Sequence, residues 1–152
     1  MKEDEVEKIY KTILKNIIEP LTGDETTYLN ELLGVGKKLF GVKFKGVFPS
    51  DKIPKLNDLS PYAILNLDRS KEPGSHWVAI AKNDKDDITL LYDSFGREGN
   101  KIIKSLNYSG NGRIVNTDLD AEQKVKETNC GARCLAWLVV CDMYGFENAK
   151  KI

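Results

Sequence analysis

The sequence predicts an α+β domain in which a small mixed or antiparallel sheet packs against a buried helix, with further helices at the N-terminus. Three observations support this fold class. Apolar residues recur at helical spacing near the N-terminus. Short apolar runs with the composition of strands follow in the middle of the chain. A long apolar stretch close to the C-terminus then predicts a helix buried against the sheet.

The N-terminal segment predicts an amphipathic helix over residues 1–20. Its apolar residues fall on one helical face, and Pro20 is expected to end the pattern because proline lacks an N–H donor. The apolar residues are Val6, Ile9, Tyr10, Ile13, Leu14, Ile17 and Ile18.

A second helix is expected after Thr22 and Glu25, whose spacing resembles a capping box. Gly34 and Gly36 are expected to weaken its end, because glycine is a poor helix former. The segment 40–61 is rich in glycine and proline, so it predicts loop with short extended pieces.

Three short apolar runs rich in strand formers predict the sheet. They span 62–67, 77–81 and 88–92. The polar segment 82–87 suits a hairpin turn between the second and third runs. Farther on, the expected elements are a short helix at 101–106, a turn at 110–112, a strand at 113–115 and the buried helix at 130–144. Gly145 is a natural end for that last helix.

Length and composition favour a single domain over residues 1–152. The formal net charge is zero, so overall electrostatics predicts neither nucleic acid nor a membrane as an obligatory partner. Three cysteines clustered in one segment are a poor disulfide framework, and the N-terminus shows no apolar signal region. These features indicate a reducing, intracellular compartment. We expect a monomer without a cofactor.

Four polar residues occur along the chain in an order that suits a cysteine nucleophile: His76, Asp93, Gln123 and Cys130. Such a nucleophile needs a base, an acceptor that orients the base, and a donor for the developing oxyanion. His76 opens one predicted strand and Asp93 closes the next, so a hairpin would make them neighbours. The alternatives are a surface histidine at a strand start and an ordinary turn aspartate.

Cys130 opens the buried helix, where unpaired backbone N–H groups and a partial positive charge favour a thiolate. Gly131 would let a substrate backbone approach closely. The alternative is a small apolar core residue, which suits Cys134 and Cys141 better because they lie within the helix. With one histidine and no second cysteine pair, no metal site is expected. Gln123 is either a solvated side chain or an amide donor to an oxyanion.

These local sequences resemble the adenain-like cysteine proteases and their relatives, the SUMO-specific proteases. The similar stretches are Gly-Ser-His-Trp-Val-Ala-Ile, Tyr-Asp-Ser-Phe-Gly and Asn-Cys-Gly-Ala-Arg-Cys, with a glutamine before the last. The upstream stretch that begins Gly-Lys-Lys-Leu-Phe-Gly is similar to the capsid-maturation proteases of virophages of the Sputnik type and related DNA viruses. The resemblance runs over roughly 33–145.

This resemblance implies a cysteine endopeptidase that processes viral capsid precursor proteins during virion maturation and cuts after small or glycine residues. It assigns the base, orienting, oxyanion-donor and nucleophile roles to His76, Asp93, Gln123 and Cys130. It gives Trp77 a packing role beside the active site, and it makes Trp77 and Gly131 the substrate-binding residues. It also implies a location in the virus factory of the host-cell cytoplasm and in the virion. Adenain has glutamate where this chain has Asp93, whereas the SUMO-specific proteases use aspartate.

Other functions remain open at this point. One alternative is a protease that deconjugates ubiquitin-like modifiers, and another is a catalytically dead binding module on the same fold. The presence of all four polar residues argues against the dead module, and the short chain mildly favours the maturation protease. Adenain's peptide and DNA activators are not indicated by a chain of zero net charge. A papain-like enzyme is excluded because its cysteine precedes its histidine.

Overall fold

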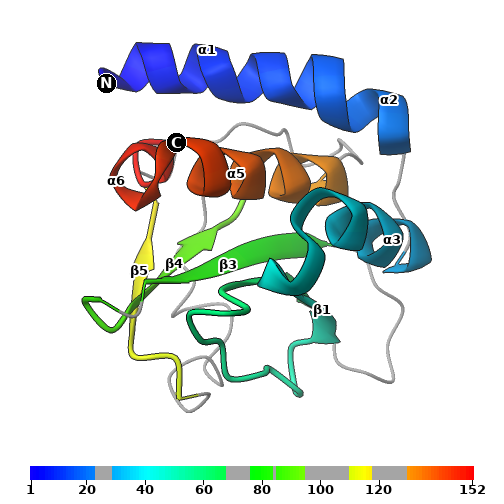
Figure 1. The fold of residues 1–152 in the computed structure, drawn as a ribbon, viewed down its shortest axis with the longest axis vertical. Coiled ribbons are helices and arrows are strands. Elements are labelled where there is room, and N and C mark those ends of the chain that lie inside the picture. The colour runs from blue at the N-terminus through cyan, green and yellow to red at the C-terminus, as the bar shows by residue number, and fades with distance from the viewer. Residues whose placement is uncertain (23–28, 68–75, 84, 95–109, 118–129) are drawn as a thin grey trace.

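The computed structural model describes residues 1–22, 29–67, 76–83, 85–94, 110–117 and 130–152. Within them, a five-stranded sheet lies beneath a layer of helices, and the N-terminal helix lies over that layer (Figure 1). The α+β class predicted from the sequence is therefore confirmed. None of the helices in this described part of the chain combines the length and the apolar content that crossing a bilayer requires.

The N-terminal helical run is longer than predicted. It consists of α1 (Glu3–Ile13), a π-helical turn η1 (Leu14–Ile18) and α2 (Glu19–Thr22). The prediction that Pro20 ends it was wrong, because α2 continues for two residues to Thr22. In the wide turn the Glu19 N–H bonds the Leu14 carbonyl, and this widening accommodates the proline ring before the helix ends.

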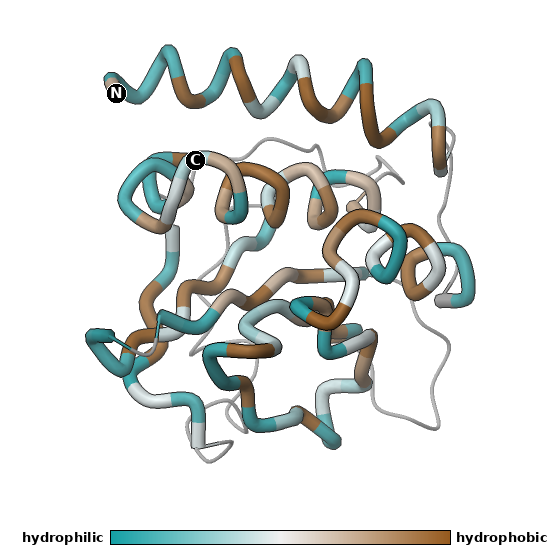
Figure 2. The backbone as a smooth tube through the Cα atoms, in the orientation of Figure 1, coloured by the Kyte–Doolittle hydropathy of each residue, from teal (hydrophilic) through white to brown (hydrophobic). Residues whose placement is uncertain are grey.

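The side of α1 that faces the rest of the molecule is apolar, and its outer side is hydrophilic (Figure 2). Its buried residues repeat at helical spacing and continue through the π turn, as the amphipathic pattern predicted. These residues are Val6, Tyr10, Ile13, Leu14 and Ile18. Burying this face makes the helix part of the main hydrophobic core.

The second helix, α3 (Leu29–Phe40), continues through both glycines that were expected to weaken it. The reason is packing. A Cβ atom on Gly36 would lie 2.4 Å from the Phe44 ring, so glycine here lets that ring pack against the helix. Thr22 is the last residue of α2 and its hydroxyl donates to the Ile18 carbonyl, while its expected part in a capping box for the next helix stays a prediction. Glu25, the other residue of the expected capping box, lies outside the described residues.

The segment predicted to be loop with extended pieces contains a full strand. A 3-10 turn, η2 (Gly41–Lys43), leads into β1 (Phe44–Pro49), which pairs with β2 in parallel. The register shifts at Gly46, whose φ of 142° is accessible to glycine. Because Gly46 and Pro49 interrupt the alternation of apolar and polar residues, β1 lacks the usual sequence pattern of a strand.

The remaining strands follow in chain order across the sheet. They are β2 (Tyr62–Asn66), β3 (Trp77–Asn83), β4 (Ile88–Tyr92) and β5 (Arg113–Asn116). The predicted hairpin is confirmed, because β3 and β4 pair antiparallel with Ala79 opposite Tyr92 and Asn83 opposite Ile88. β2 also pairs antiparallel with β3, whereas the two outer pairs are parallel, so the sheet is mixed.

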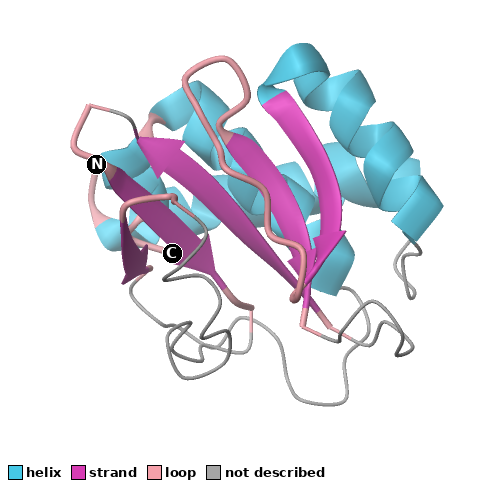
Figure 3. Ribbon diagram, turned by 90° about the horizontal axis from the view of Figure 1, so that it is seen from below, coloured by secondary structure: helices cyan, strands magenta, loops and turns pink. Residues whose placement is uncertain are grey.

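The helix α5 (Cys130–Tyr144) covers one face of the sheet, and Gly145 ends it with a φ of 86°. Its cover is close because Ala79 and Ala81, both fully buried, provide small side chains on the facing side of β3. A short helix, α6 (Phe146–Ala149), follows. The loop between β1 and β2 crosses the other face (Figure 3), where Leu56 joins a second, smaller apolar cluster. The expected helix at 101–106 lies outside the described residues.

Candidate active site

The antiparallel hairpin brings together two of the predicted site residues. His76 directly precedes β3 and Asp93 directly follows β4, so the start of one strand lies beside the end of the other. The His76 Nε2 atom is 2.7 Å from Asp93 Oδ1, which is hydrogen-bond distance. This is the juxtaposition that the hairpin pattern predicted.

Cys130, which comes later in the chain, also lies at this end of the hairpin. It is the first residue of α5, and its Sγ atom accepts a hydrogen bond from the Trp77 backbone N–H at 3.4 Å. The ladder between β3 and β4 begins at Ala79, so Trp77 lies beyond the part of β3 that pairs with β4, although it pairs with Asn66 of β2 on the other side. Its N–H is therefore directed at the sulfur instead of at a carbonyl of β4.

All three side chains are buried, with exposed fractions of 6% for His76, 4% for Asp93 and 4% for Cys130. These values rule out the surface-histidine alternative. A solvated turn aspartate is also excluded, because Asp93 is enclosed and paired with the imidazole. The alternative for Cys130, a small apolar core residue, is correct in part, because Cys130 belongs to the main hydrophobic core. Its sulfur also has a polar partner, which that alternative does not explain.

The pKa of His76 is raised above its ordinary value of 6.5. Burial is the largest single influence and it acts in the opposite direction, because a charged imidazole loses its hydration. Hydrogen bonds to Asp93 and to Cys130, together with the charges of those two groups, outweigh burial. These interactions therefore stabilise the protonated form of the imidazole more than in an ordinary histidine.

The other two cysteines behave as core residues. Cys134 and Cys141 are buried within α5, and burial raises the pKa of each thiol well above its ordinary value. Charge repulsion from Cys130 and Asp93 adds to this effect at Cys134. Of the three thiols, only Cys130 lies beside the imidazole.

The remaining predicted residues have different outcomes. Gln123 lies outside the described residues, so its role stays a prediction. Gly131 is in the first turn of α5, and Trp77 is 6% exposed with its side chain in the main core. The Trp77 side chain is thus buried in the core, and its expected role at the substrate stays a prediction. The sequence did not predict that the Trp77 backbone N–H donates to Cys130, because every residue except proline carries such a group.

Metal ligands do not assemble in the described part of the chain, where no three His, Cys, Asp or Glu side chains come close enough to hold an ion. No known protein-family model matches the sequence, and a search of curated proteins finds no match. The functional argument therefore depends on the geometry of the site and on the resemblance of its local sequences.

Proposed function

We propose that the protein is a cysteine endopeptidase in which Cys130 is the nucleophile, His76 the general base and Asp93 the residue that orients the base. The observation that carries this proposal is the meeting of these three buried side chains at one end of the β3–β4 hairpin. Asp93 bonds the imidazole at 2.7 Å, and the imidazole also interacts with the Cys130 sulfur. A nucleophile, a base and an orienting group in contact are the signature of an activated thiol.

The chemistry begins with a proton transfer. Because Asp93 holds Nε2 of His76, Nδ1 is the nitrogen that accepts the proton from Cys130 Sγ. The thiolate then attacks the carbonyl carbon of the scissile peptide bond and forms a tetrahedral oxyanion. The C–N bond breaks as the imidazolium gives its proton to the leaving amine. A water molecule, deprotonated by His76, attacks the thioester, releases the carboxylic acid and returns the proton to sulfur.

The start of α5 also supplies a place for the oxyanion. The first backbone N–H groups of a helix have no partner within the helix, so they point at a charge that develops beside Cys130. The Trp77 N–H, already directed at the sulfur, stabilises negative charge on the thiolate. Gly131 adds no side chain next to the nucleophile, which fits a peptide with small residues at the cut.

Gln123 is proposed as a side-chain donor to the same oxyanion. Removing one such donor lowers turnover by roughly 10²–10³-fold in a well-studied protease. We therefore expect Gln123→Ala to reduce kcat by about this factor while KM changes little, as steady-state kinetics would show. Unchanged kcat with a raised KM would make Gln123 a substrate-binding residue.

We propose viral capsid precursors as the substrates on the strength of the sequence resemblance, with cleavage after small or glycine residues during virion maturation. The proposal includes the adenain-like fold and a location in the virus factory and virion. The deconjugation of ubiquitin-like modifiers is the second candidate. Both activities use the same three side chains, so substrate profiling has to separate them.

The experiment incubates the protein with a capsid precursor and, separately, with a modifier–fluorophore conjugate, with and without prior thiol alkylation. We expect cleavage of the precursor, with mass spectrometry placing the cut after a small residue, and loss of cleavage after alkylation. Cys141→Ala is the matched control, since that thiol lies in α5 far along the helix from Cys130 and should be dispensable. Cleavage of the conjugate alone would favour the second candidate. Equal cleavage by a Cys130→Ala variant would refute the thiol mechanism.

A further inference from the structure

A buried hydrogen bond connects the N-terminal helix to the strand that carries Asp93. The hydroxyl oxygens of Tyr10 and Tyr92 are 2.5 Å apart, although the residues are 82 positions apart in the chain. Their exposed fractions are 0% and 1%, and their rings meet edge to face at 6.0 Å. Tyr10 is in the middle of α1, and Tyr92 is the last residue of β4.

Tyr92 also joins this strand to the helix that carries Cys130. Its ring stacks on Trp137 of α5, with 5.4 Å between centroids and 6° between planes. Trp137 follows Cys130 by seven residues, two helical turns, and its indole N–H donates to the Ala149 carbonyl at 2.9 Å. The stack thus fixes the end of β4 against α5. Ala79, opposite Tyr92 on β3, adds no bulk beside it.

The end of β4 needs such a fixing point because the strand ladder stops there. Tyr92 is the last residue of β4 that pairs with β3, and Asp93 follows it directly. The position of the carboxylate therefore depends on how the Tyr92 side chain is held. Burial, and then the charge and hydrogen bond of Tyr10, raise the pKa of Tyr92 well above its ordinary value. The Tyr92 hydroxyl accordingly stays neutral at any pH at which the site would work.

We propose that Tyr10 is a positioning residue for the active site: by holding the Tyr92 hydroxyl, the N-terminal helix sets the place of Asp93 relative to His76 and Cys130. This inference rests on the proposed function for its kinetic consequence, but its structural consequence is independent of any substrate. In this proposal α1 has two roles: it covers the core, and it helps to position a side chain of the active site. The rival explanation is that α1 contributes stability alone through its buried apolar face.

Two matched variants separate these explanations. Tyr10→Phe removes one hydroxyl and keeps the ring. Tyr62→Phe makes the same change at the first residue of β2, where the hydroxyl donates to Asp142 at 3.1 Å. That site is at the opposite end of the strand from Asn66, the partner of Trp77, so it lies away from Cys130. Each variant loses one tyrosine hydrogen bond, and only Tyr10→Phe removes a bond to Tyr92, the residue next to Asp93.

His76 is the only histidine in the chain, so NMR gives a single imidazole titration. We expect Tyr10→Phe to lower the pKa of His76, because a displaced Asp93 bonds the imidazolium less well, and to reduce kcat about tenfold at unchanged KM. Tyr62→Phe should leave both the titration and kcat unchanged. Tyr92→Phe, which breaks the same bond from the other side and keeps the stack, should reproduce the Tyr10→Phe result.

A His76 titration that is the same in Tyr10→Phe, Tyr92→Phe and the unmodified protein would overturn the inference, whatever the activities are. If the unmodified protein cleaves no peptide and Cys130 is unreactive, the proposed function fails while the titration still decides this proposal. If cleavage is efficient and both titrations are unchanged, the positioning role alone fails. Circular dichroism at the assay temperature confirms that each variant is folded in every arm.

Discussion

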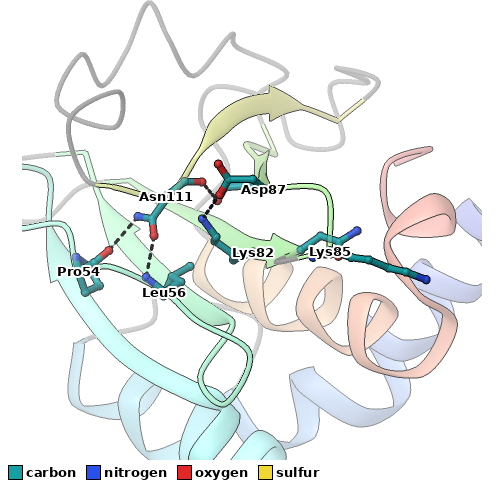
Figure 4. A network of polar contacts seen from close by, with 8 residues as sticks. Pro54, Leu56, Lys82, Lys85, Asp87 and Asn111 are labelled. Atoms are coloured by element: carbon teal, nitrogen blue, oxygen red, sulfur yellow. Dashed lines mark hydrogen bonds and ion pairs between the residues drawn. The ribbon is translucent and has the colours of Figure 1, made fainter.

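The two ends of the β3–β4 hairpin each bury polar groups, but the partners of those groups differ. At the turn end, the Asn111 side chain accepts from the Leu56 N–H at 2.7 Å and donates to the Pro54 carbonyl at 2.9 Å (Figure 4). Beside it, the buried Lys82 ammonium pairs with the exposed Asp87 carboxylate at 2.8 Å. The amide here satisfies backbone groups that would otherwise be buried without partners, which is a structural role.

At the opposite end the polar side chains bond one another. Asp93, His76 and Cys130 form a row of three titratable groups, and burial of the imidazole opposes its charge. Burying titratable groups lowers the stability of the fold unless they are well paired, and a purely structural network does not require such groups. A buried row of acid, base and thiol has groups that can exchange protons, whereas a buried amide that holds two backbone groups does not. The comparison therefore supports the proposal that the two ends of the hairpin have different roles.

The sharpest test of this comparison is removal of the thiol. Cys130→Ala should lower turnover by about 10⁴–10⁶-fold, since removing a nucleophile leaves only residual catalysis. The variant should stay folded, because alanine fills most of the same small buried space. In the unmodified protein, brief iodoacetamide labelling followed by mass spectrometry should modify Cys130 before Cys134 and Cys141, whose burial raises the pKa of their thiols. Earlier labelling of either of those two would contradict the assignment.

A second test removes the charge that orients the base. Asp93→Asn should reduce kcat by about 10⁴-fold, as loss of the orienting carboxylate does in a serine protease. It should also lower the pKa of His76, because the hydrogen bond and the charge of Asp93 would no longer oppose the effect of burial. NMR titration of the single imidazole measures this directly. A His76 pKa that is unchanged in the variant would show that Asp93 does not hold the imidazole.

The turn end should give the reverse result. Asn111→Ala leaves the buried Leu56 N–H and the Pro54 carbonyl without their side-chain partner, so we expect a loss of about 2 kcal/mol or more in the free energy of unfolding. Denaturant titration measures this loss, and kcat below the melting transition should be unchanged. Asn16→Ala, at an exposed position of the N-terminal helical run, is the control and should stay within about 0.5 kcal/mol. A fall in kcat with Asn111→Ala would contradict the purely structural role assigned to the turn end of the hairpin.

The smallest expected effect is a pH dependence of stability from His76. Its folded-state pKa is raised above 6.5, so protonation stabilises the fold fully below pH 6.5, and this contribution is lost as the pH rises through the folded-state pKa. The contribution is about 1.4 kcal/mol for each unit by which the pKa is raised. Unfolding titrations across this range should show the slope in the unmodified protein. In Asp93→Asn the slope should become smaller, because the His76 pKa is then raised less.

The site could be predicted from sequence to the extent that its geometry is local. The polar connection between β3 and β4 sets their register, and that register alone makes His76 and Asp93 neighbours. It is shorter than the predicted turn at 82–87, because Lys82 and Asn83 are part of β3. The placement of Cys130 at the start of α5 followed from one apolar stretch and its boundary. Where neighbours in space are also close in the chain, or where one element begins, residue patterns were sufficient.

The features that could not be predicted depend on contacts distant in sequence. β1 lacks an apolar alternation and is a strand because β2 lies beside it. α3 passes through Gly36 because the Phe44 ring needs the space, although glycine alone predicts a helix end. The bond between Tyr10 and Tyr92 joins residues that carry no shared pattern. Only the folded chain brings these partners together, so sequence spacing held no signal for them.

The π turn between α1 and α2 has a consequence for insertions and deletions. Four buried residues, Val6, Tyr10, Leu14 and Ile18, are each spaced by four, and in a regular α-helix that spacing drifts by 40° per step. The wide turn slows the rotation after Leu14 and returns Ile18 to the face that carries Tyr10. One additional residue has thus been absorbed without rotating either flank. A relative of this protein that lacked one residue between Leu14 and Pro20 would keep Tyr10 in place with a plain α-helix, so chain length here is free to vary where helix phase is not.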